Sequence, residues 1–266
     1  QLYDGGQGID TYVLDLEDWS FADDFVGEVN FPTNFSGIHL DHTHTLNDTV
    51  LNFENITLRG DVDYKMFGDK KDNVITTDGG NDIIYGGEGN DVLSSGAGDD
   101  FVYGEAGNDT IILNNSGTQL YDGGEGVDTF KVYLPNWTTA PDGYVGVVDL
   151  NFGIVYAEGD FLNPLNDTLV SIENVTVDTQ YGYVIKGNDV NNILIGGIGD
   201  DTLSSGDGDD RLFGGLGDDV LIISGTGDSI LDGGVGIDTF KIDLSNYTPP
   251  EGVTDFAYKA DLSTGF

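Results

Sequence analysis

Acidic residues recur every nine positions in two stretches of this chain, and carboxylates at so regular a spacing could bind metal ions. The first stretch, residues 68–112, reads GDKKDNVIT, TDGGNDIIY, GGEGNDVLS, SGAGDDFVY and GEAGNDTII; the second, residues 187–222, reads GNDVNNILI, GGIGDDTLS, SGDGDDRLF and GGLGDDVLI. The sixth residue of each copy is Asp or Asn: Asn73, Asp82, Asp91, Asp100, Asp109, Asn192, Asp201, Asp210 and Asp219. A degenerate further copy, residues 223–231, retains Asp228. Oxygen ligands in such an array suit a hard cation.

The elements that would position these carboxylates are a turn and a short strand in every copy. The first six residues are rich in Gly, Asn and Asp, which favour turns, and the fourth is usually Gly, which readily adopts positive φ. Residues seven to nine form a short β segment whose aliphatic eighth residue points to a narrow core. Two copies therefore make one coil of a solenoid. We expect Asn73, Asp91 and Asp109 to stack on one edge, and Asp82 and Asp100 on the other.

Stacked carboxylates require a cation between them. Coils of a parallel sheet lie about 4.8 Å apart, and carboxylates about 5 Å apart repel by about 0.8 kcal/mol in water and by more when partly buried. Ca²⁺ accepts six to eight carboxylate and carbonyl oxygens in irregular geometry, whereas Mg²⁺ requires a tight octahedron. We expect several Ca²⁺ ions, with loop carbonyls supplied around the glycines Gly80, Gly87, Gly89, Gly96, Gly98, Gly107, Gly197, Gly199, Gly206, Gly208, Gly215 and Gly217.

The first copy of each block departs from this pattern because it is poor in glycine. Lys70 and Lys71 occupy the first loop of the first block, where carbonyl oxygens would face a cation. We expect that loop to mark the end of calcium binding.

A longer repeat contains both blocks. The opening phrase QLYDGGQGIDT recurs as QLYDGGEGVDT at 119–129 and as SILDGGVGIDT at 229–239, which adds Asp10, Asp128 and Asp238 as candidate ligands. NDTVLNFENIT at 47–57 likewise matches NDTLVSIENVT at 166–176. We predict three units: residues 1–118 with the block 68–112, residues 119–228 with the block 187–222, and a partial unit 229–266. We expect the chain to be a piece of a longer tandem array.

The nonapeptides resemble a known family of repeats. GGEGNDVLS at residues 86–94 fits the phrase G-G-x-G-x-D-x-U-x at every position, and the chain therefore resembles the RTX, or hemolysin-type calcium-binding repeat, family. The resemblance implies an all-β fold, a right-handed parallel β-roll with Ca²⁺ between stacked loops. It also implies type I secretion of an unfolded chain from a bacterium, and folding in extracellular calcium.

Composition excludes several other classes of protein. The 266 residues carry 48 acidic and 9 basic side chains, a net charge of −39, which disfavours binding to nucleic acid phosphates. Because 38% of the residues are hydrophobic and regularly spaced, disorder is also disfavoured. The chain has no Cys, so disulfides are excluded. No apolar run is long enough for a transmembrane helix.

Beside the carboxylate array, the chain contains predicted strands between the blocks and two groups of side chains that could carry other chemistry. Segments 129–133, 143–150, 153–156, 169–177 and 183–185 are predicted strands that extend the solenoid or cap it. His39, His42 and His44 could bind zinc or nickel, although the matching GDFLNPLND has no His. Tyr85 and Tyr103, eighteen residues apart, could form an aromatic ladder that binds sugar or packs against a neighbouring segment. No GxSxG motif is present, and we expect no enzyme activity.

The sequence thus predicts a calcium-binding structural module of a secreted or surface-attached bacterial protein, adhesin-like or an exoprotein, whose partners are calcium ions and neighbouring repeats. Two alternatives stay open: a module that binds polysaccharide or another cell surface through the segments between the blocks, and the C-terminal secretion and folding module of a secreted enzyme.

Overall fold

The computed structural model describes residues 2–16, 26–30, 49–51, 53–114, 117–134, 144–158, 166–243 and 245, and within these ranges the chain forms strands and no helix. The strands are β1 Leu2–Asp4, β2 Thr11–Asp15, β3 Val26–Asn30, β4 Thr49–Leu51, β5 Asn55–Arg59, β6 Asp63–Phe67, β7 Val74–Thr76, β8 Ile83–Glu88, β9 Val92–Ser94, β10 Phe101–Ala106, β11 Thr110–Leu113, β12 Leu120–Asp122, β13 Thr129–Tyr133, β14 Val145–Asp149, β15 Ile154–Glu158, β16 Asn166–Val170, β17 Asn174–Asp178, β18 Tyr183–Lys186, β19 Ile193–Gly197, β20 Thr202–Ser204, β21 Arg211–Leu216, β22 Val220–Ile223, β23 Ile230–Val235 and β24 Thr239–Ile242.

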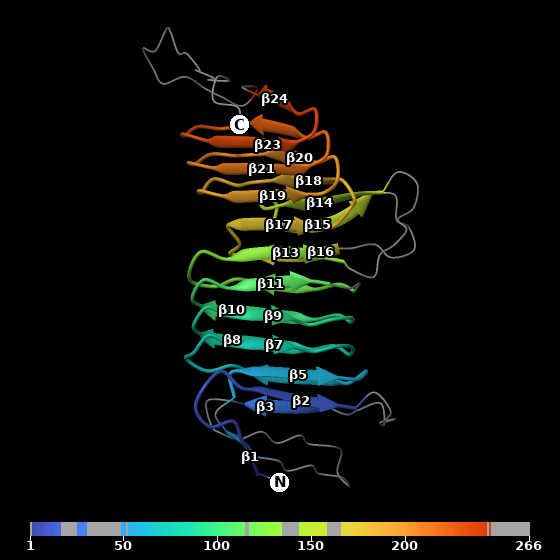
Figure 1. Cartoon of the computed structure of the whole chain (residues 1–266), viewed down its shortest axis with the longest axis vertical. Coiled ribbons are helices and arrows are strands. Elements are labelled where there is room, and N and C mark those ends of the chain that lie inside the picture. The colour runs from blue at the N-terminus through green and yellow to red at the C-terminus, as the bar shows by residue number, and fades with distance from the viewer. Residues whose placement is uncertain are drawn as a thin grey trace.

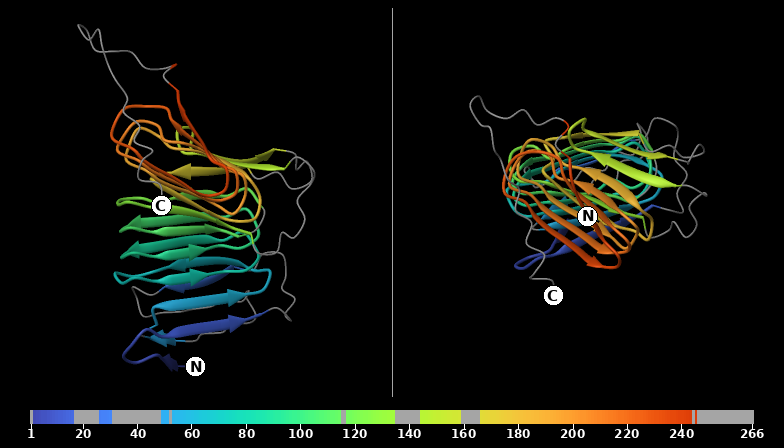
Figure 2. Two further views of the ribbon diagram at one scale, coloured as in Figure 1. Left: turned by 45° about the horizontal axis from the view of Figure 1, so that its top comes forward. Right: turned by 90° about the horizontal axis from the view of Figure 1, so that it is seen from above.

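All strands except β1 and β4 wind into a β-solenoid with two facing, mainly parallel sheets (Figure 1), while β1 and β4 pair with each other in a separate two-stranded parallel sheet. One sheet has 12 strands in the order β24-β22-β20-β18-β14-β15-β16-β12-β10-β8-β6-β3, and the other has 10 in the order β2-β5-β7-β9-β11-β13-β17-β19-β21-β23. Within each block, successive strands of the chain alternate between the sheets. Figure 2 shows the coils stacked along the long axis and superposed when viewed from above. The predicted all-β solenoid is confirmed.

The eighth residue of each nonapeptide lies in the core, as predicted. The register aligns equivalent residues one coil apart, so Ile75 pairs with Leu93, which pairs with Ile111, and Ile84 pairs with Val102. Each of these five side chains has an exposed fraction of 0%. Burying an Ile, Leu or Val contributes about 1.5–3 kcal/mol, and each coil of a block buries two such residues. The solenoid is thus held together inside by one aliphatic column per sheet.

The segments between the blocks extend the solenoid. Strand β12 pairs in parallel with β10, and β13 pairs with β11, so the coils continue across residues 118 and 119. The predicted strand 169–177 is wrong as a single element. It is the end of β16 and most of β17, in opposite sheets, with a turn between them at Ser171, whose φ is 51°. Only β15 departs from the parallel pattern among the described strands, since it pairs antiparallel with β14 and β16.

The described core is continuous along the whole stack. Strands also pair across residues 228 and 229, where β21 lies beside β23 and β22 beside β24. The division into units 1–118, 119–228 and 229–266 remains a prediction from sequence repeats.

Candidate metal sites along two edges of the solenoid

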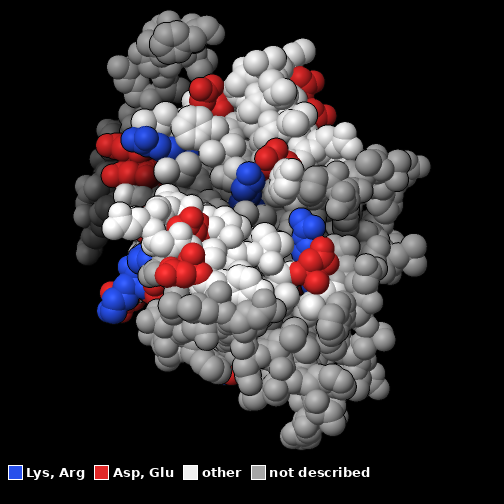
Figure 3. All heavy atoms as spheres, turned by 60° about the horizontal axis from the view of Figure 1, so that its bottom comes forward, with Lys and Arg blue, Asp and Glu red and all other residues white. Residues whose placement is uncertain are grey.

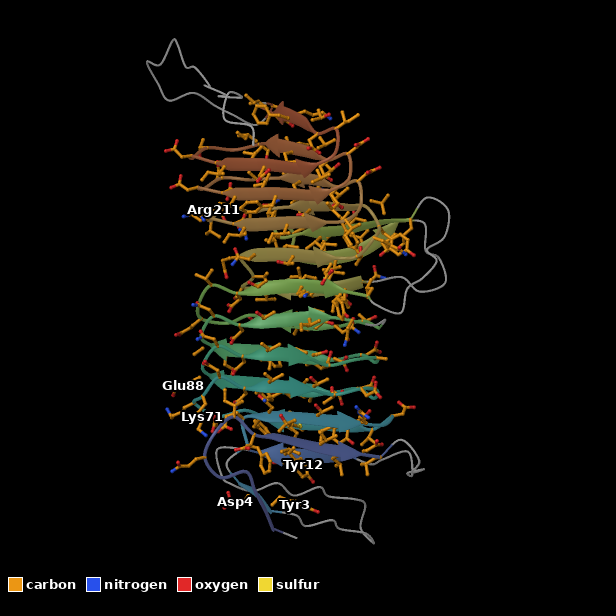
Figure 4. The ribbon with its side chains drawn as sticks, viewed as in Figure 1. Tyr3, Asp4, Tyr12, Lys71, Glu88 and Arg211 are labelled. Atoms are coloured by element: carbon orange, nitrogen blue, oxygen red, sulfur yellow. The ribbon has the colours of Figure 1, made fainter. Side chains whose placement is uncertain are left out.

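The sixth residues of the nonapeptides gather in two ladders, one on each edge of the solenoid. We define the first edge by the loops that lead into the 10-stranded sheet, with Asn73, Asp91, Asp109, Asn192 and Asp210; in Figure 4 it is the edge where Lys71 and Glu88 are labelled. We define the second edge by the loops that lead into the 12-stranded sheet, with Asp82, Asp100, Asp201 and Asp219. The predicted stacking of the nonapeptide loops in both blocks is confirmed.

One oxygen of each stacked carboxylate binds the backbone of the preceding coil. The N–H of Asn73 donates to Oδ1 of Asp91 at 2.7 Å, and the N–H of Asp91 donates to Oδ1 of Asp109 at 2.7 Å. On the second edge, the N–H of Asp82 donates to Oδ1 of Asp100 at 2.9 Å. The second block repeats the arrangement, with donor and acceptor pairs Asn192 and Asp210, Asp201 and Asp219, and Asp219 and Asp238.

The other carboxylate oxygen is buried and has no hydrogen-bond partner in the structure. This holds for Oδ2 of Asp82, Asp91, Asp100, Asp109, Asp128, Asp201, Asp210 and Asp219. Each of these side chains is at most 1% exposed. A buried ionised oxygen without a partner is strongly destabilising, so such groups pair with a charge or coordinate a metal. The repeated orphan oxygen is the feature of this structure that most directly indicates cation binding.

Glycines bring further oxygens close to these carboxylates. A Cβ built on Gly86 would lie 2.4 Å from Oδ2 of Asp91 and 2.7 Å from the carbonyl oxygen of Gly104. A Cβ on Gly107 would lie 1.5 Å from the carbonyl oxygen of Gly89, one coil below. Any larger residue would therefore separate the loops, and glycine allows carboxylate and carbonyl oxygens of neighbouring coils to converge. Carbonyl and carboxylate oxygens in an irregular arrangement are the ligands that Ca²⁺ accepts.

Most of the predicted glycines also need their positive φ. The left-handed region is occupied by Gly80, Gly87, Gly89, Gly96, Gly98, Gly107, Gly197, Gly206, Gly208, Gly215 and Gly217. Gly199 is the exception: it is absent from this set, and its requirement for glycine comes from close packing, since a Cβ would lie 2.4 Å from backbone atoms of Tyr181. Glu105 occupies the second position of its copy with φ 74° although it has a side chain.

The electrostatics of the metal-free sites oppose ionisation. Desolvation by burial is the main cause that raises the pKa of Asp82 to about 8, of Asp91 to about 7 and of Asp201 to about 7. Neighbouring carboxylates, such as Asp109 beside Asp91, raise these values further. The backbone N–H donors lower the pKa but do not compensate for burial. A bound dication would supply the missing favourable interaction, so the residues present fit Ca²⁺.

Basic side chains do not neutralise these ladders. Within the described ranges, ion pairs join Lys70 to Glu88, Lys71 to Glu54 and Lys131 to Asp178, and no ion pair involves a sixth-position Asp. On the face shown in Figure 3, the blue Lys and Arg side chains lie beside red carboxylates. Among the described residues, these lysines thus pair with carboxylates other than those at the sixth positions.

The structure changes the predicted position of Asp228. In the register, Arg211 pairs with Ile230, so Ser229 rather than Asp228 occupies the level above Asp210. The N–H of Asp228 instead donates to Oδ1 of Asp209 at 2.8 Å, nineteen residues away, and the side chain is exposed. The physical reason is one extra residue in this coil, which the regular spacing of nine did not reveal. The spacing of nine, continued through the degenerate copy 223–231, predicts that Asp228 stacks on Asp210, and this prediction is therefore wrong.

The isolated nonapeptide loops lie on the same two edges. Oδ1 of Asp128 accepts the N–H of Asp109 at 2.7 Å and continues the first edge. Asp10 also has an orphan buried Oδ2, and its N–H donates to Oε2 of Glu54 at 3.2 Å. Asp238 accepts from Asp219, but its own side chain is exposed.

Sequence reasoning missed two groups of residues. Glu54, Glu173 and Asp167 accept ladder hydrogen bonds from Asp10, Asp128 and Gln119, although none lies in a nonapeptide block. The signal for these residues in the sequence was the repeat of NDTVLNFENIT, residues 47–57, as NDTLVSIENVT, residues 166–176. The fifth residues of the nonapeptides form a second ladder, whose hydrogen bonds run in the opposite direction along the chain. In this ladder the N–H of the later coil donates to the side chain of the preceding coil, as from Asn90 to Oδ1 of Asp72 at 2.8 Å. The signal there was Asn or Asp at position five of every copy.

Of the two alternative sites, the structure describes the aromatic ladder but not the histidines. Tyr85 does stack on Tyr103, with ring centroids 5.0 Å apart and planes within 11°, and Phe67 extends the stack with centroids 5.0 Å apart and planes within 4°. The rings thus cover one another's faces, and the ammonium of Lys65 lies over Phe67 at 5.0 Å. The predicted aromatic ladder is therefore confirmed as a stack of rings, and its binding to sugar stays a prediction. His39, His42 and His44 lie outside the described residues.

Comparison with known proteins agrees with the geometry. The family model of the RTX calcium-binding nonapeptide repeat matches four times, at residues 65–93, 76–111, 86–120 and 186–221. These matches cover both blocks and the coil that follows the first. No curated protein matches the chain. Among the described residues no helix is long and apolar enough to cross a membrane.

Proposed function

Because residues 65–120 and 186–221 are RTX calcium-binding nonapeptide repeats, we propose that the chain is a structural module that folds when calcium binds outside the cell. The observation that carries the proposal is the set of orphan carboxylate oxygens buried along both edges. Without a cation these oxygens oppose folding, and with one they stabilise it. The module would belong to a secreted or surface-attached bacterial protein, with no reaction of its own.

The ions would lie between adjacent loops of one edge. On the first edge the candidate intervals are Asn73/Asp91, Asp91/Asp109, Asp109/Asp128 and Asn192/Asp210. On the second edge they are Asp82/Asp100 and Asp201/Asp219. Intervals with two carboxylates would bind more strongly than those with Asn, because each carboxylate adds a charge that the dication neutralises. Ligands from the carbonyl groups of the loop glycines would complete six to eight oxygens.

The expected energies are large relative to the stability of a domain. A site that binds only the folded state adds about 2.7 kcal/mol at a calcium concentration one hundred times its dissociation constant. Several such sites together exceed the usual stability of a domain, about 5–15 kcal/mol. The fold would therefore depend on its ions. At the low calcium concentration of a cytosol the net charge of −39 would favour an extended chain that can be exported.

Calcium counting tests the proposal. Equilibrium dialysis or native mass spectrometry of the whole chain would measure bound Ca²⁺ per molecule, with Mg²⁺ as the control ion. We expect several Ca²⁺ ions and fewer after Asp91→Asn, which removes a charge from two intervals. Asp178→Asn is the matched control, because Asp178 lies on the outer face of β17 and pairs with Lys131 at 3.3 Å. A chain that binds no Ca²⁺ at millimolar concentration would overturn the proposal.

A further inference from the structure

A second kind of site lies on the second edge, at the junction between the first block and the coils that follow it. Leu120 pairs with Phe101 and with Thr168, so Gln119 and Asp167 occupy the level that Asp100 holds in the block. The N–H of Gln119 donates to Oδ1 of Asp167 at 3.0 Å, which repeats the ladder geometry. Asp167 lies outside every nonapeptide copy.

Three side-chain oxygens at this junction are buried without a partner. They are Oδ2 of Asp100, Oε1 of Gln119 and Oδ2 of Asp167. The side chains are 1%, 2% and 2% exposed. The amide of Gln119 is oriented by its own hydrogen bond, since Nε2 donates to the carbonyl oxygen of Gly98 at 2.9 Å. The amide oxygen of Gln119, Oε1, is therefore the atom that remains available to a ligand.

The charge of this group is also uncompensated. Asp100 and Asp167 are close enough for their charges to interact, and within the described ranges neither forms an ion pair with Lys or Arg. The phenol of Tyr121 is 1% exposed and lies close enough to both carboxylates to interact with their charges. The buried hydroxyl of Ser95 also lies close to Asp100 and Tyr121. These two hydroxyls carry one hydrogen each and cannot satisfy three oxygens. Two buried carboxylates without a cation oppose folding.

We propose that Asp100, Gln119 and Asp167 hold a divalent cation of the calcium type at this junction. Two carboxylates and an amide oxygen are hard ligands that suit Ca²⁺, whereas zinc sites in proteins use nitrogen or sulfur ligands that are missing from this group. The inference rests on the proposed function for the identity of the ion. The site joins β10 of the first block to β12 and β16 of the following coils, so the ion links the two units.

The first experiment counts ions in matched variants of the whole chain. Asp167→Asn removes a carboxylate of nearly the same shape and is expected to lower the number of bound Ca²⁺ ions by one. Asp178→Asn removes an equal charge from an outer face and is expected to leave the number unchanged. An unchanged number in Asp167→Asn overturns this inference alone, whereas a wild-type chain without bound Ca²⁺ overturns the proposed function as well.

A spectroscopic measurement places the ion without removing a ligand. Tb³⁺ replaces Ca²⁺ and emits when a nearby tyrosine transfers energy to it. Tyr121→Phe keeps the ring and is expected to lower the tyrosine-excited emission by a measurable fraction while the number of bound ions stays constant. Tyr133→Phe, an exposed ring on β13, is the control. Equal emission from Tyr121→Phe and wild type contradicts an ion beside Tyr121.

If Asp167→Asn does not fold, a substitution that adds a charge still tests whether an ion binds at the junction. Gln119→Glu puts a third carboxylate at the junction, so we expect a lower melting temperature than wild type at limiting Ca²⁺ but a larger rise than in wild type when Ca²⁺ is raised to saturation. If no ion binds here, the added charge lowers the melting temperature equally at limiting and at saturating Ca²⁺, and that result would overturn the inference.

Discussion

Lys71 Nζ lies 2.5 Å from Oε1 of Glu54, so the ammonium group of a lysine pairs with a carboxylate of the acidic ladder. Glu54 is nearly buried, and its other oxygen accepts the N–H of Asp10 as a ladder carboxylate does. The hydrogen bond from Lys71 is the main cause that lowers the pKa of Glu54. In the second predicted unit Glu173 occupies the equivalent level, but Val190 stands where the lysine would be. The lysine that pairs with Glu54 therefore has no counterpart beside Glu173.

Substitutions at these two positions should change the stability of the metal-free chain in opposite directions. Lys71→Met leaves Glu54 unpaired and should lower the stability of the metal-free chain by about 1 kcal/mol, a modest value because Lys71 is half exposed. Val190→Lys should raise it by a similar amount by pairing with Glu173. Folding of the chelator-treated chain with increasing TMAO, which favours burial, measures both changes.

Lys70→Met is the matched control for that exchange, because Lys70 pairs with Glu88 and both side chains are exposed. We expect a change below about 0.5 kcal/mol. Equal losses from Lys70→Met and Lys71→Met would contradict a special role for the Lys71–Glu54 pair.

Asp91→Asn should change the stability in opposite directions with and without calcium. Without calcium the variant removes a buried charge, and the native Asn73 shows that Asn fits this level of the ladder, so we expect a gain of about 2 kcal/mol. With calcium it loses a ligand charge from two intervals and should be less stable than wild type by at least as much. TMAO-induced folding in chelator and thermal melts in saturating Ca²⁺ make the comparison. A loss of stability in chelator as well would indicate that Asp91 stabilises the fold by its hydrogen bond alone.

The stability of the metal-free chain should fall as the pH rises. The pKa of Asp82 is raised to about 8, of Asp91 to about 7 and of Asp100 to about 6, mainly because burial disfavours the charged form, whereas an unfolded Asp has a pKa of about 3.9. The folded state thus binds more protons than the unfolded state between pH 4 and 8, so stability is greatest below about pH 4 and is lost progressively as the pH rises through about 8. Folding induced by the osmolyte TMAO, which favours burial, tests the sign in metal-free buffers from pH 4 to 8.5. A stability that rises with pH would contradict the burial of charged, unpaired carboxylates.

Glu105→Gly should stabilise the first block. Glu105 has φ 74°, at a position where five other copies use a left-handed glycine, namely Gly87, Gly96, Gly197, Gly206 and Gly215. Since a left-handed residue with a side chain costs about 1–2 kcal/mol, we expect a gain near 1 kcal/mol after the loss of chain entropy of glycine is included. Glu105→Gln removes the charge and keeps the strain, so it serves as the control. A gain that is equal in both variants would assign the effect to charge and not to the backbone.

The amount of structure that could be predicted from the sequence follows from how strictly the repeat is kept. Ile75, Leu93 and Ile111 recur at a fixed spacing, which predicts the parallel coils and the core, and the glycines predict where the backbone is left-handed. The stacked Asp ladders follow from the same period. The position of Asp228 does not follow from this period, because a single extra residue changes the register without changing the local composition.

The segments between the blocks were harder for a different physical reason. The run 169–177 contains apolar residues on both sides of Ser171, so it resembles one strand, yet Ser171 adopts positive φ and turns the chain from one sheet to the other. The roles of Gln119 and Asp167 depend on which coil stacks on which, and only the pairing of β12 with β10 and β16 reveals them.

The central claim is that calcium creates the fold, and it is tested most directly by titrating Ca²⁺ into chelator-treated protein while far-UV circular dichroism and sedimentation velocity are recorded. The account predicts an expanded chain with little β signal before calcium, and a steep, cooperative gain of β signal and compaction with Ca²⁺ that Mg²⁺ does not produce. A β signal and sedimentation coefficient already complete in chelator at neutral pH would contradict it, and the Asp ladders would then be edges that fold without their ions.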